Sequence, residues 1–511
     1  MFSKVKSAHI SGIDGILIEV EAYISSSGLP SFNIVGLADN AIKESRDRIK
    51  ASLKNLNFNI FNRPITINLA PADIRKEGTH FDLPIAVALL KAAGYIKKEC
   101  NEVVVLGELS LDGKIRNVAG VLPMVIEAKN NGIRGIFLPA GNVQEAAFVE
   151  NLEIFGFQSL DELLKYLQGE LIIPPVKTKN FEDLLKAPYK GPDFKDVINQ
   201  KMAKRSVEVA AAGMHNMIMI GPPGSGKTMI AKRVPGILPE LEFNEALETT
   251  KIHSVAGILR RKKGLVVKRP FISPHHTASD VSIIGGTKAV IPGLVSLAHN
   301  GVLFLDEFLE FKRTVLEVLR QPLEDGYVTI SRAGKTILYP AKFMLIASCN
   351  PCPCGFLWSK KRECNCAQTQ IVKYQSKLSG PLIDRIDMHI KMDEVDLSQY
   401  NYSSNEESSD IIRTRVTKAI NRQKERFKDL EFSYNAHMSE EYIRECIIMN
   451  GSLNKLLEKI NLAYGLSGRS ISKIIKLART IADLSEDSVI KDVHILEAVK
   501  LRYLDINHRI N

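Results

Sequence analysis

Residues 217–234 read MIMIGPPGSGKTMIAKRV, and this stretch decides the fold class of the second half of the chain. Its first four residues are apolar and predict a buried strand, while the residues after Thr228 predict a helix. The glycines between them let backbone N–H groups close around phosphates. We therefore predict a nucleotide-binding loop made of Gly221, Pro222, Pro223, Gly224, Ser225, Gly226, Lys227 and Thr228.

A second motif supplies the acidic groups that such a loop needs for hydrolysis. The segment GVLFLDEF, residues 301–308, predicts a buried strand that ends in Asp306 and Glu307. Parallel α/β sheets bind ligands at the carboxyl ends of their strands. With ATP and Mg²⁺ as cofactors, we expect Lys227 to reach the β- and γ-phosphates, and Thr228 and Asp306 to hold the ion. Glu307 would then polarise the attacking water.

A third strand and a later loop offer further polar groups for the same site. The strand FMLIASCN, residues 343–350, ends in Asn350, whose amide can reach a γ-phosphate but which is also an ordinary turn residue. In LSGPLIDRIDMHI, residues 378–390, Arg385 can stabilise charge on a neighbouring subunit's nucleotide. An ion pair from Arg385 to Asp384 or Asp387 is the equally weighted alternative.

One more arginine is a candidate phosphate sensor. Residues 467–484 predict a helix that begins at Ser467 and carries Arg469 in its first turn. From there Arg469 can reach back to the γ-phosphate, and Arg479 in the same helix is the second choice.

Four of the seven cysteines lie in NPCPCGFLWSKKRECNC, residues 350–366. The pattern is C-x-C, nine residues, then C-x-C, which offers four thiolates to one tetrahedral ion. Structural Zn²⁺ is the preferred interpretation, with an iron–sulfur cluster or no metal as alternatives. Disulfides are disfavoured in a reducing compartment. The predicted ligands are Cys352, Cys354, Cys364 and Cys366.

Charge separates the front of the chain from the rest. Residues 1–169 hold 18 Lys and Arg against 19 Asp and Glu, and the remaining residues hold 50 against 39. The basic rear part favours a polyanion such as nucleic acid, although a solvated basic surface is the plainer alternative. No apolar run reaches membrane-spanning length, and the N-terminus has no signal-peptide pattern, so we expect a cytoplasmic protein without a membrane partner.

Composition divides the 511 residues into four parts. Residues 1–168 mix strand and helix patterns, including a hairpin near the start, and predict an α/β domain. Residues 169–192 carry four of the 22 prolines and predict a linker. Residues 193–393 predict a second α/β domain with the cysteine-rich insertion 352–366, and residues 394–511 predict a helical domain.

These motifs resemble a known family. The segments LAHNGVLFLDEF, LRQPLEDG, SCNPCPCG and LSGPLIDRIDMHI are similar to magnesium-chelatase-like AAA+ proteins and, more closely, to the bacterial competence protein ComM family. The resemblance implies an AAA+ P-loop NTPase core, a C-terminal helical lid, a sensor role for Asn350 and a homo-hexamer. One departure is Asn199, where the family usually has glycine.

The same resemblance implies a function. Proteins of the ComM family are described as ATP-driven helicases that extend DNA branches during recombination in natural transformation. The implied partner is single-stranded and branched DNA, bound independently of sequence. Chelatase subunits with a similar core serve porphyrin metallation instead, so a motor that remodels a protein or porphyrin complex is the alternative.

The front domain resembles the Lon-protease type, which is related to ribosomal protein S5 domain 2. Lon proteases use a Ser–Lys dyad, and His80 and Met124 stand at the corresponding positions of this sequence. Methionine cannot accept a proton and the serine nucleophile is replaced. We therefore expect this fold without protease activity, as an assembly or docking domain.

Two basic loops are candidates for DNA contact. The segment YVTISRAGKTILYP, residues 327–340, predicts a hairpin with Arg332 and Lys335 beside its tip. Lys288 lies in a second, glycine-flanked loop. Basic tips suit phosphate contacts that do not read sequence, and a solvated turn is the alternative in each case. His275 and His276 are predicted to be polar loop residues.

Overall fold

The computed structural model describes residues 1–98, 102–186, 189, 191–261, 264–286, 290–332, 335–378, 380–394, 406–448 and 451–507. The chain forms two compact units. Unit 1 consists of Met1–Ala187, Glu242–Val267 and Val290–Pro292, and unit 2 of Pro188–Leu241, Lys268–Ala289 and Gly293–Asn511. Residues 242–267, which we predicted as part of the second α/β domain, thus belong to unit 1.

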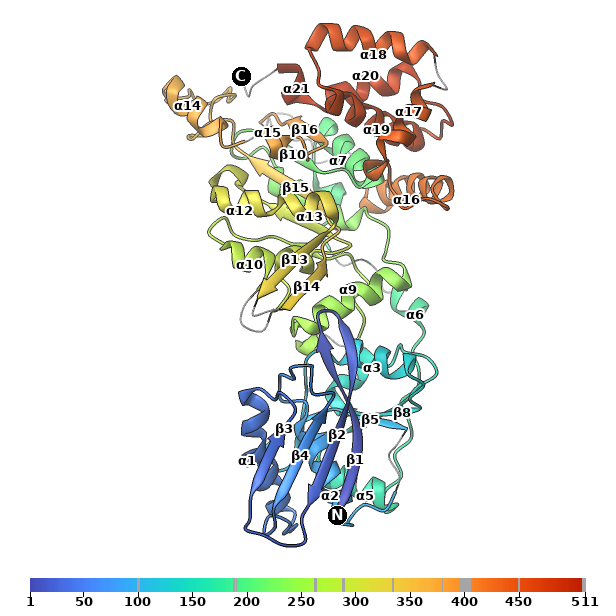
Figure 1. Cartoon of the computed structure of the whole chain (residues 1–511). Helices are drawn as coiled ribbons and strands as arrows, with labels where there is room; N and C mark the ends of the chain where they lie inside the picture. The colour runs from blue at the N-terminus through green and yellow to red at the C-terminus, as the bar shows by residue number, and fades with distance from the viewer. Residues whose placement is uncertain are drawn as a thin grey trace. The chain divides into compact units, whose positions relative to one another are not determined.

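Unit 1 is built on a seven-stranded sheet in the order β3-β4-β2-β1-β5-β8-β9 (Figure 1). The first two strands form the predicted hairpin, with Phe2 opposite Tyr23. On the other side of β1, strands β5, β8 and β9 run parallel to it. The strands are β1 (Phe2–Ser11), β2 (Asp14–Ile24), β3 (Phe32–Val35), β4 (Ile65–Ala70), β5 (Val103–Val105), β8 (Gly135–Pro139) and β9 (Glu153–Phe157), with a small β6 (Glu108–Leu109) and β7 (Ile115–Arg116) pair beside them.

Helices cover both faces of this sheet because alternate residues of its strands point to opposite sides. Phe137 packs in one core and Ile136 in the other. The first core includes residues of α1 (Asn40–Asn55), α2 (Asp82–Ala92) and α5 (Leu160–Gln168). The second includes residues of α3 (Val121–Asn130) and α4 (Val143–Ala146), and a short α6 (Phe181–Leu185) packs against it.

The segment 242–267 explains why the predicted boundary differs. Its helix α9 (Phe243–Val255) packs against α3 (Figure 1), and Leu265 is buried in the second core of unit 1. The backbone N–H of Gly120 donates to the carbonyl oxygen of Ser254 at 3.0 Å. The Ser254 hydroxyl donates to Glu145 at 3.2 Å, and burial raises the pKa of that carboxyl to about 7. Long-range contacts, rather than chain order, therefore assign the segment to unit 1.

Unit 2 contains a five-stranded sheet in the order β11-β12-β15-β10-β16, in which every neighbouring pair is parallel. Because all strands run the same way, their carboxyl ends meet at one edge. The strand before the predicted nucleotide loop lies between β15 and β16. The strands are β10 (Met217–Ile220), β11 (Phe271–Ile272), β12 (Val302–Leu305), β15 (Met344–Cys349) and β16 (Met388–Lys391).

Short helices and one hairpin complete the sheet region of unit 2. The predicted hairpin is confirmed as β13 (Tyr327–Arg332) and β14 (Lys335–Pro340). Its tip at 333–334 and Lys288 lie outside the described residues, as do the side chains of Arg332 and Lys335. The helices are α7 (Lys201–Gly213), α8 (Lys227–Ala231), α10 (Asp280–Ile284), α11 (Leu294–Leu297), α12 (Arg313–Val318), α13 (Arg320–Asp325), α14 (Gln368–Gln375) and α15 (Gly380–Ile383).

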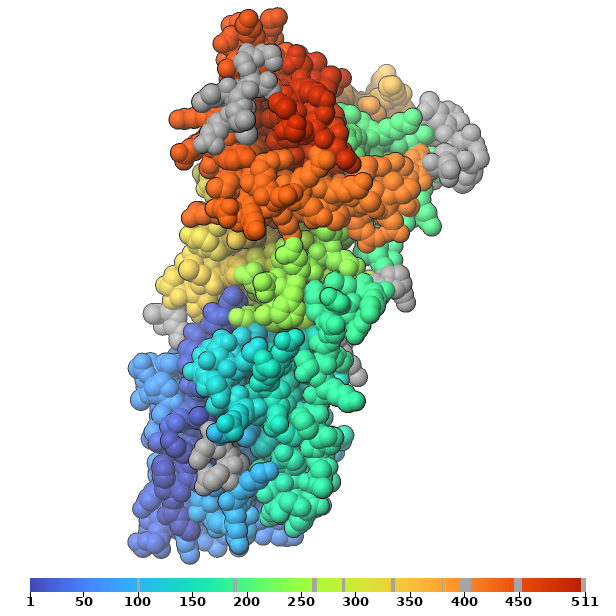
Figure 2. All heavy atoms as spheres, turned by 90° about the vertical axis from the view of Figure 1, so that its right-hand side faces the viewer, coloured from blue at the N-terminus to red at the C-terminus, as the bar shows by residue number. Residues whose placement is uncertain are grey.

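The C-terminal part of unit 2 is helical, as predicted. Its helices, orange to red, form one continuous body in the space-filling view (Figure 2). Ile420 and Ile481 from these helices share a core with Met217 and Ile390 of the sheet. The helices are α16 (Ser409–Arg426), α17 (Glu440–Ile448), α18 (Gly451–Tyr464), α19 (Gly468–Leu484), α20 (Asp492–Lys500) and α21 (Tyr503–Asn507). None of the described helices of the chain combines the length and the apolar character needed to cross a bilayer.

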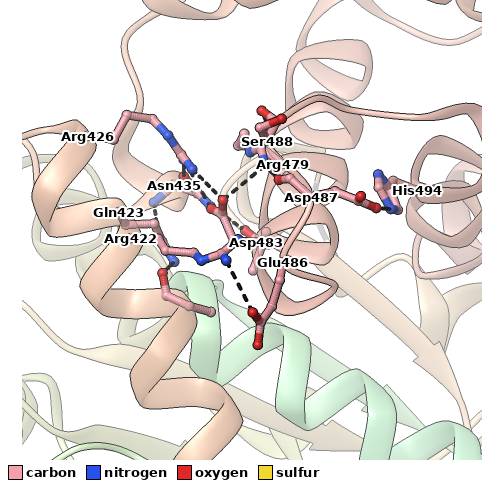
Figure 3. A network of polar contacts seen from close by, with 12 residues as sticks. Arg422, Gln423, Arg426, Asn435, Arg479, Asp483, Glu486, Asp487, Ser488 and His494 are labelled. Carbon is pink, nitrogen blue, oxygen red and sulfur yellow. Dashed lines mark hydrogen bonds and ion pairs between the residues drawn. The ribbon is translucent and has the colours of Figure 1, made fainter.

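A buried carboxylate ties the C-terminal helices together (Figure 3). Asp483 is 1% exposed and accepts hydrogen bonds from Arg426, Asn435 and Arg479. Arg479 also donates to the carbonyl oxygen of Ser488 at 2.8 Å. Arg479 is thus committed to the helical core, which removes it as the second choice for a phosphate sensor.

Candidate nucleotide-binding site

The predicted nucleotide loop leaves the end of β10 and enters α8. Gly226 has φ +86°, a backbone conformation that L side chains rarely adopt, and it immediately precedes Lys227 at the first turn of α8. The Gln200 amide donates to the carbonyl oxygens of Ser225, at 3.3 Å, and Asp393, at 3.2 Å. Gln200 therefore links the loop to the segment after β16.

Lys227 lies inside this loop. Its side chain is buried, and its ammonium donates to the carbonyl oxygens of Gly221 at 2.6 Å and Pro222 at 2.9 Å. The Asn350 amide oxygen lies 3.4 Å from the same nitrogen. Burial lowers the pKa of Lys227. The loop thus holds one cation between its own carbonyls and the end of β15, where phosphate oxygens are expected.

Two oxygen ligands suited to Mg²⁺ meet beside the loop. The Thr228 hydroxyl donates to one carboxylate oxygen of Asp306 at 2.7 Å, and the Ser348 hydroxyl donates to the other. Thr228 lies in α8, which follows β10 and the loop, and Asp306 directly follows β12 of the same sheet. Hydroxyl and carboxylate oxygens are the ligands that Mg²⁺ prefers, so these residues fit the predicted ion.

Glu307 follows Asp306 with a left-handed backbone, at φ +53°. Its carboxylate pairs with His276 Nδ1 at 3.0 Å. His276 follows β11, whose strand lies next to β12 in the sheet, so strand order brings the two residues together. The adjacent His275 instead contacts the Thr277 hydroxyl at 2.8 Å. Both histidines lie in a loop, as predicted, and the pairing of His276 with Glu307 was not predicted.

The two candidate arginines make contacts away from the loop. Arg385 donates to the carbonyl oxygen of Pro381 at 2.5 Å and to the Glu324 carboxylate. The predicted alternative partners of Arg385 are therefore wrong. Asp384 instead pairs with Arg469 at 3.0 Å, and Asp387 pairs with Lys473 of α19 at 3.3 Å. Among the described residues, neither arginine bonds to the nucleotide loop.

The four clustered cysteines converge on one point. Their sulfur atoms all lie within 4.8 Å of one another, and Cys352 Sγ is 3.4 Å from Cys354 Sγ and 3.7 Å from Cys364 Sγ. A tetrahedral ion with metal–sulfur bonds of about 2.3 Å would hold sulfurs about 3.8 Å apart. Cys352, Cys354, Cys364 and Cys366 are free thiols, so the cluster fits a single metal ion.

Comparisons with known proteins agree across the chain. Three family models match: "Magnesium chelatase, subunit ChlI" over residues 193–400, "Subunit ChlI of Mg-chelatase" over 20–142, and "Magnesium chelatase, subunit ChlI C-terminal" over 406–502. Competence protein ComM of Haemophilus influenzae is 37% identical over 496 residues, which cover 96% of this chain and 95% of that protein. The chain is a ComM-like member of the magnesium-chelatase family of AAA+ proteins.

Other relatives differ in how much they share with this ComM-like protein. The uncharacterized protein YifB of Escherichia coli is 38% identical over 500 residues, covering 97% of this chain and 96% of that one. The magnesium-chelatase subunit ChlI of Chlorella vulgaris is 26% identical over 181 residues, covering 31% of this chain and 51% of that one. The similarity to ComM thus extends over nearly the whole chain, whereas the similarity to this chelatase subunit does not.

In this ComM-like protein, Asn199 stands where the family usually has glycine, and its backbone conformation explains why asparagine is tolerated there. Its φ is +64°, in the left-handed region where glycine is favoured and asparagine is tolerated. Its backbone N–H donates to Glu406 at 3.0 Å. The substitution therefore preserves the turn that places Gln200 against the nucleotide loop.

In the front unit of this ComM-like protein, the positions compared with a protease dyad are unsuited to proton transfer. His80 is buried and stacks on His9, with ring centroids 5.7 Å apart, and desolvation lowers the pKa of His80 to about 3. Met124 is fully buried in a hydrophobic core. The Thr79 hydroxyl donates to the Glu108 carboxylate. The side chains of His80 and Met124 thus serve the packing of the unit.

Proposed function

We propose that this protein is an ATP hydrolase that works as a homo-hexameric DNA motor and promotes branch migration in homologous recombination during natural transformation. The observation that carries the proposal is the meeting of Lys227, Thr228, Asp306, Glu307 and Asn350 at one sheet edge. The near full-length similarity to a protein named for competence supports the biological setting.

The residues divide the work of hydrolysis. Lys227 grips the β- and γ-phosphates, and Thr228 and Asp306 orient the Mg²⁺ ion, which neutralises charge on the phosphates. Glu307 polarises the attacking water, and Asn350 donates its amide to the γ-phosphate. Asn350 already lies 3.4 Å from Lys227, and the Thr228 hydroxyl lies 2.7 Å from Asp306, so these groups need no large movement.

The arginines act between subunits and at the lid. Arg385 leaves Glu324 and reaches the nucleotide of the neighbouring subunit, which is the reason for proposing a ring of subunits. Arg469 moves from Asp384 towards the γ-phosphate of its own subunit. The exchange is feasible for Arg469 because its ion pair is exposed and exposed pairs contribute only about 0–1 kcal/mol.

DNA binding is proposed for the basic rear part of the chain. The hairpin β13–β14 would present Arg332 and Lys335 to phosphates in a central channel, and Lys288 would do so from its own loop. Such contacts bind single-stranded and branched DNA without reading sequence and weaken with salt. A DNA-handling enzyme of this kind works in the cytoplasm.

The cysteine cluster is proposed to hold one structural Zn²⁺ ion. The convergence of four sulfur atoms supports this assignment. Metal analysis of freshly purified protein is expected to give about one zinc per chain. A content below about one zinc per two chains would exclude the assignment.

For the front unit we propose a Lon-protease-like fold without protease activity, used for assembly or partner docking. The buried His80 and Met124 support the loss of the dyad. Proteolysis of casein, measured with and without ATP, is expected to be undetectable. Cleavage that disappears in a Thr79→Ala or His80→Ala variant would overturn this part.

A second candidate is a chelatase-type motor that remodels a protein or porphyrin-metallation complex. The names of the matching family models favour it. Extension of strand exchange on a three-stranded DNA substrate separates the two candidates. We expect the wild-type protein to extend the branch with ATP and a Lys227→Ala variant to fail. A wild-type protein that hydrolyses ATP without extending any branch would favour the second candidate.

A further inference from the structure

The cysteine-rich insertion lies directly against the nucleotide loop. Cys352 and Gly355 close a turn, in which the Gly355 N–H donates to the Cys352 carbonyl oxygen at 3.0 Å. A Cβ placed on Gly355 would lie 2.8 Å from Pro223 Cδ and 3.6 Å from Asn350 Cγ. The backbone at Gly355 therefore touches a loop residue and packs beside the proposed γ-phosphate sensor at the same time.

The position of this turn depends on the four sulfur atoms. Cys352 and Cys354 belong to the turn, whereas Cys364 lies at the far end of the insertion, with its sulfur 3.5 Å from Cys354 Sγ. An ion bound to all four thiolates would fix the two ends relative to each other. Without it, the contacts seen at these side chains among the described residues are hydrogen bonds to or between sulfur atoms, which are weak.

Separate contacts anchor the middle of the insertion elsewhere in unit 2. The Trp358 ring packs edge-on against Tyr503, with centroids 5.7 Å apart, and Lys391 Nζ lies 4.5 Å from the Trp358 ring centroid. The Ser359 hydroxyl donates to Glu394 at 2.5 Å. These contacts join the insertion to β16 and α21. The insertion thus runs from the nucleotide loop to the edge strand β16, which lies next to β10 in the sheet.

We propose that the four-cysteine metal site is a positioning element of the nucleotide pocket. The bound ion holds Gly355 against Pro223 and Asn350, and tight ATP binding requires that contact. The inference rests on the ATP-binding part of the proposed function and deepens it. By thermodynamic linkage, ATP binding must in turn affect the insertion, where Trp358 is the only tryptophan of the chain.

A Gly355→Ala variant distinguishes this role from that of a simple loop staple. It keeps all four cysteines and adds one methyl group where Pro223 lies. We expect wild-type zinc content and the loss of thermal stability that an alanine at positive φ brings, but also about tenfold weaker binding of a fluorescent ATP analogue.

Gly169→Ala is the matched control for backbone strain. Gly169 has φ +83°, close to the +85° of Gly355, but a Cβ added there meets no atom within 4 Å. This variant is expected to bind the ATP analogue as tightly as the wild type. A Gly355→Ala variant that also binds it within about twofold of wild type would overturn the proposal.

Ligand substitution provides an independent arm. Zn²⁺ accepts three cysteines and one histidine, so Cys364→His is expected to retain zinc and ATP binding, whereas Cys364→Ser loses both. Adding the ATP analogue ATPγS should change Trp358 emission in the wild type and in Cys364→His, but not in Cys364→Ser. A zinc-free Cys364→Ser protein with wild-type ATP affinity would also overturn the proposal.

The outcomes separate this inference from the motor hypothesis. If the wild type extends no DNA branch while Gly355→Ala weakens ATP binding, the motor hypothesis fails and the metal-dependent pocket stands. If branch extension succeeds and Gly355→Ala behaves as wild type in both assays, the motor stands and the metal-dependent pocket fails.

Discussion

At the scale of single residues, the neighbouring acids Asp306 and Glu307 differ in their contacts. Asp306 is held by hydroxyls of Thr228 and Ser348, whereas Glu307 is exposed and meets a ring nitrogen at 3.0 Å. Asp306 is therefore suited to holding an ion, and Glu307 is suited to contacting water. From the strand end alone, the sequence predicted that Asp306 would hold the ion and that Glu307 would polarise water. The structure adds His276 as a contact of the Glu307 carboxylate.

A Glu307→Gln variant is expected to bind ATP with wild-type affinity while its turnover falls roughly 10²- to 10⁴-fold, because an amide cannot accept the proton from water. Steady-state hydrolysis and binding of a fluorescent ATP analogue measure the two effects separately. Glu310→Gln is the matched control, since Glu310 pairs instead with Lys377 at 3.9 Å. Normal hydrolysis by Glu307→Gln would refute the site assignment.

A His276→Ala variant is expected to lower kcat on the order of tenfold to a hundredfold with little change in KM, because Glu307 loses the contact that orients it. His275→Ala removes the neighbouring ring, which contacts Thr277 and lies with its centroid 4.2 Å from that of His276. It should lower kcat less than His276→Ala does, because the contact of His276 with Glu307 remains. Equal kinetics for the two variants would mean that His276 does not position Glu307.

At the scale of elements, α19 links the C-terminal helices to the segment that precedes β16. Its residue Asp483 accepts hydrogen bonds from Arg426, Asn435 and Arg479 in the helical core, as Figure 3 shows. Nearer its start, Lys473 pairs with Asp387, and Arg469 pairs with Asp384. The segment that carries Arg385 is thus bonded to α19. These ion pairs connect α19 to the arginine that we propose acts on a neighbouring subunit's nucleotide.

An Asp483→Ala variant is expected to lower the free energy of unfolding by about 3–5 kcal/mol, since it leaves the buried Arg479 and the partly buried Arg426 without their carboxylate. Urea unfolding followed by circular dichroism measures the change. Glu486→Ala is the control in the same region, because Glu486 makes an exposed ion pair with Arg422 and its loss should cost no more than about 1 kcal/mol. Equal losses in the two variants would contradict the structural role of Asp483.

At the scale of the whole molecule, local sequence patterns predicted the helices and strands well. They predicted less well which of these elements and loops contact one another. The strand and glycine pattern around Lys227, the acidic strand end and both hairpins depend on residues close in sequence, and all of these elements are present. The placement of 242–267 in unit 1 was missed, because an apolar helix face does not specify which unit will cover it. The contacts of Glu307 with His276 and of Gly355 with Pro223 were also missed. Each joins two loops that follow different strands, and a local sequence pattern does not specify which loops meet.

A DNA motor requires the nucleotide site, the basic rear part and a ring of subunits to act together. The motor hypothesis is tested most directly by the rate of ATP hydrolysis at low salt, with no DNA, single-stranded DNA and branched DNA. We predict that both DNA forms raise the rate and that the stimulation falls as salt increases. An ATPase rate that is the same with every form of DNA at low salt would contradict the account.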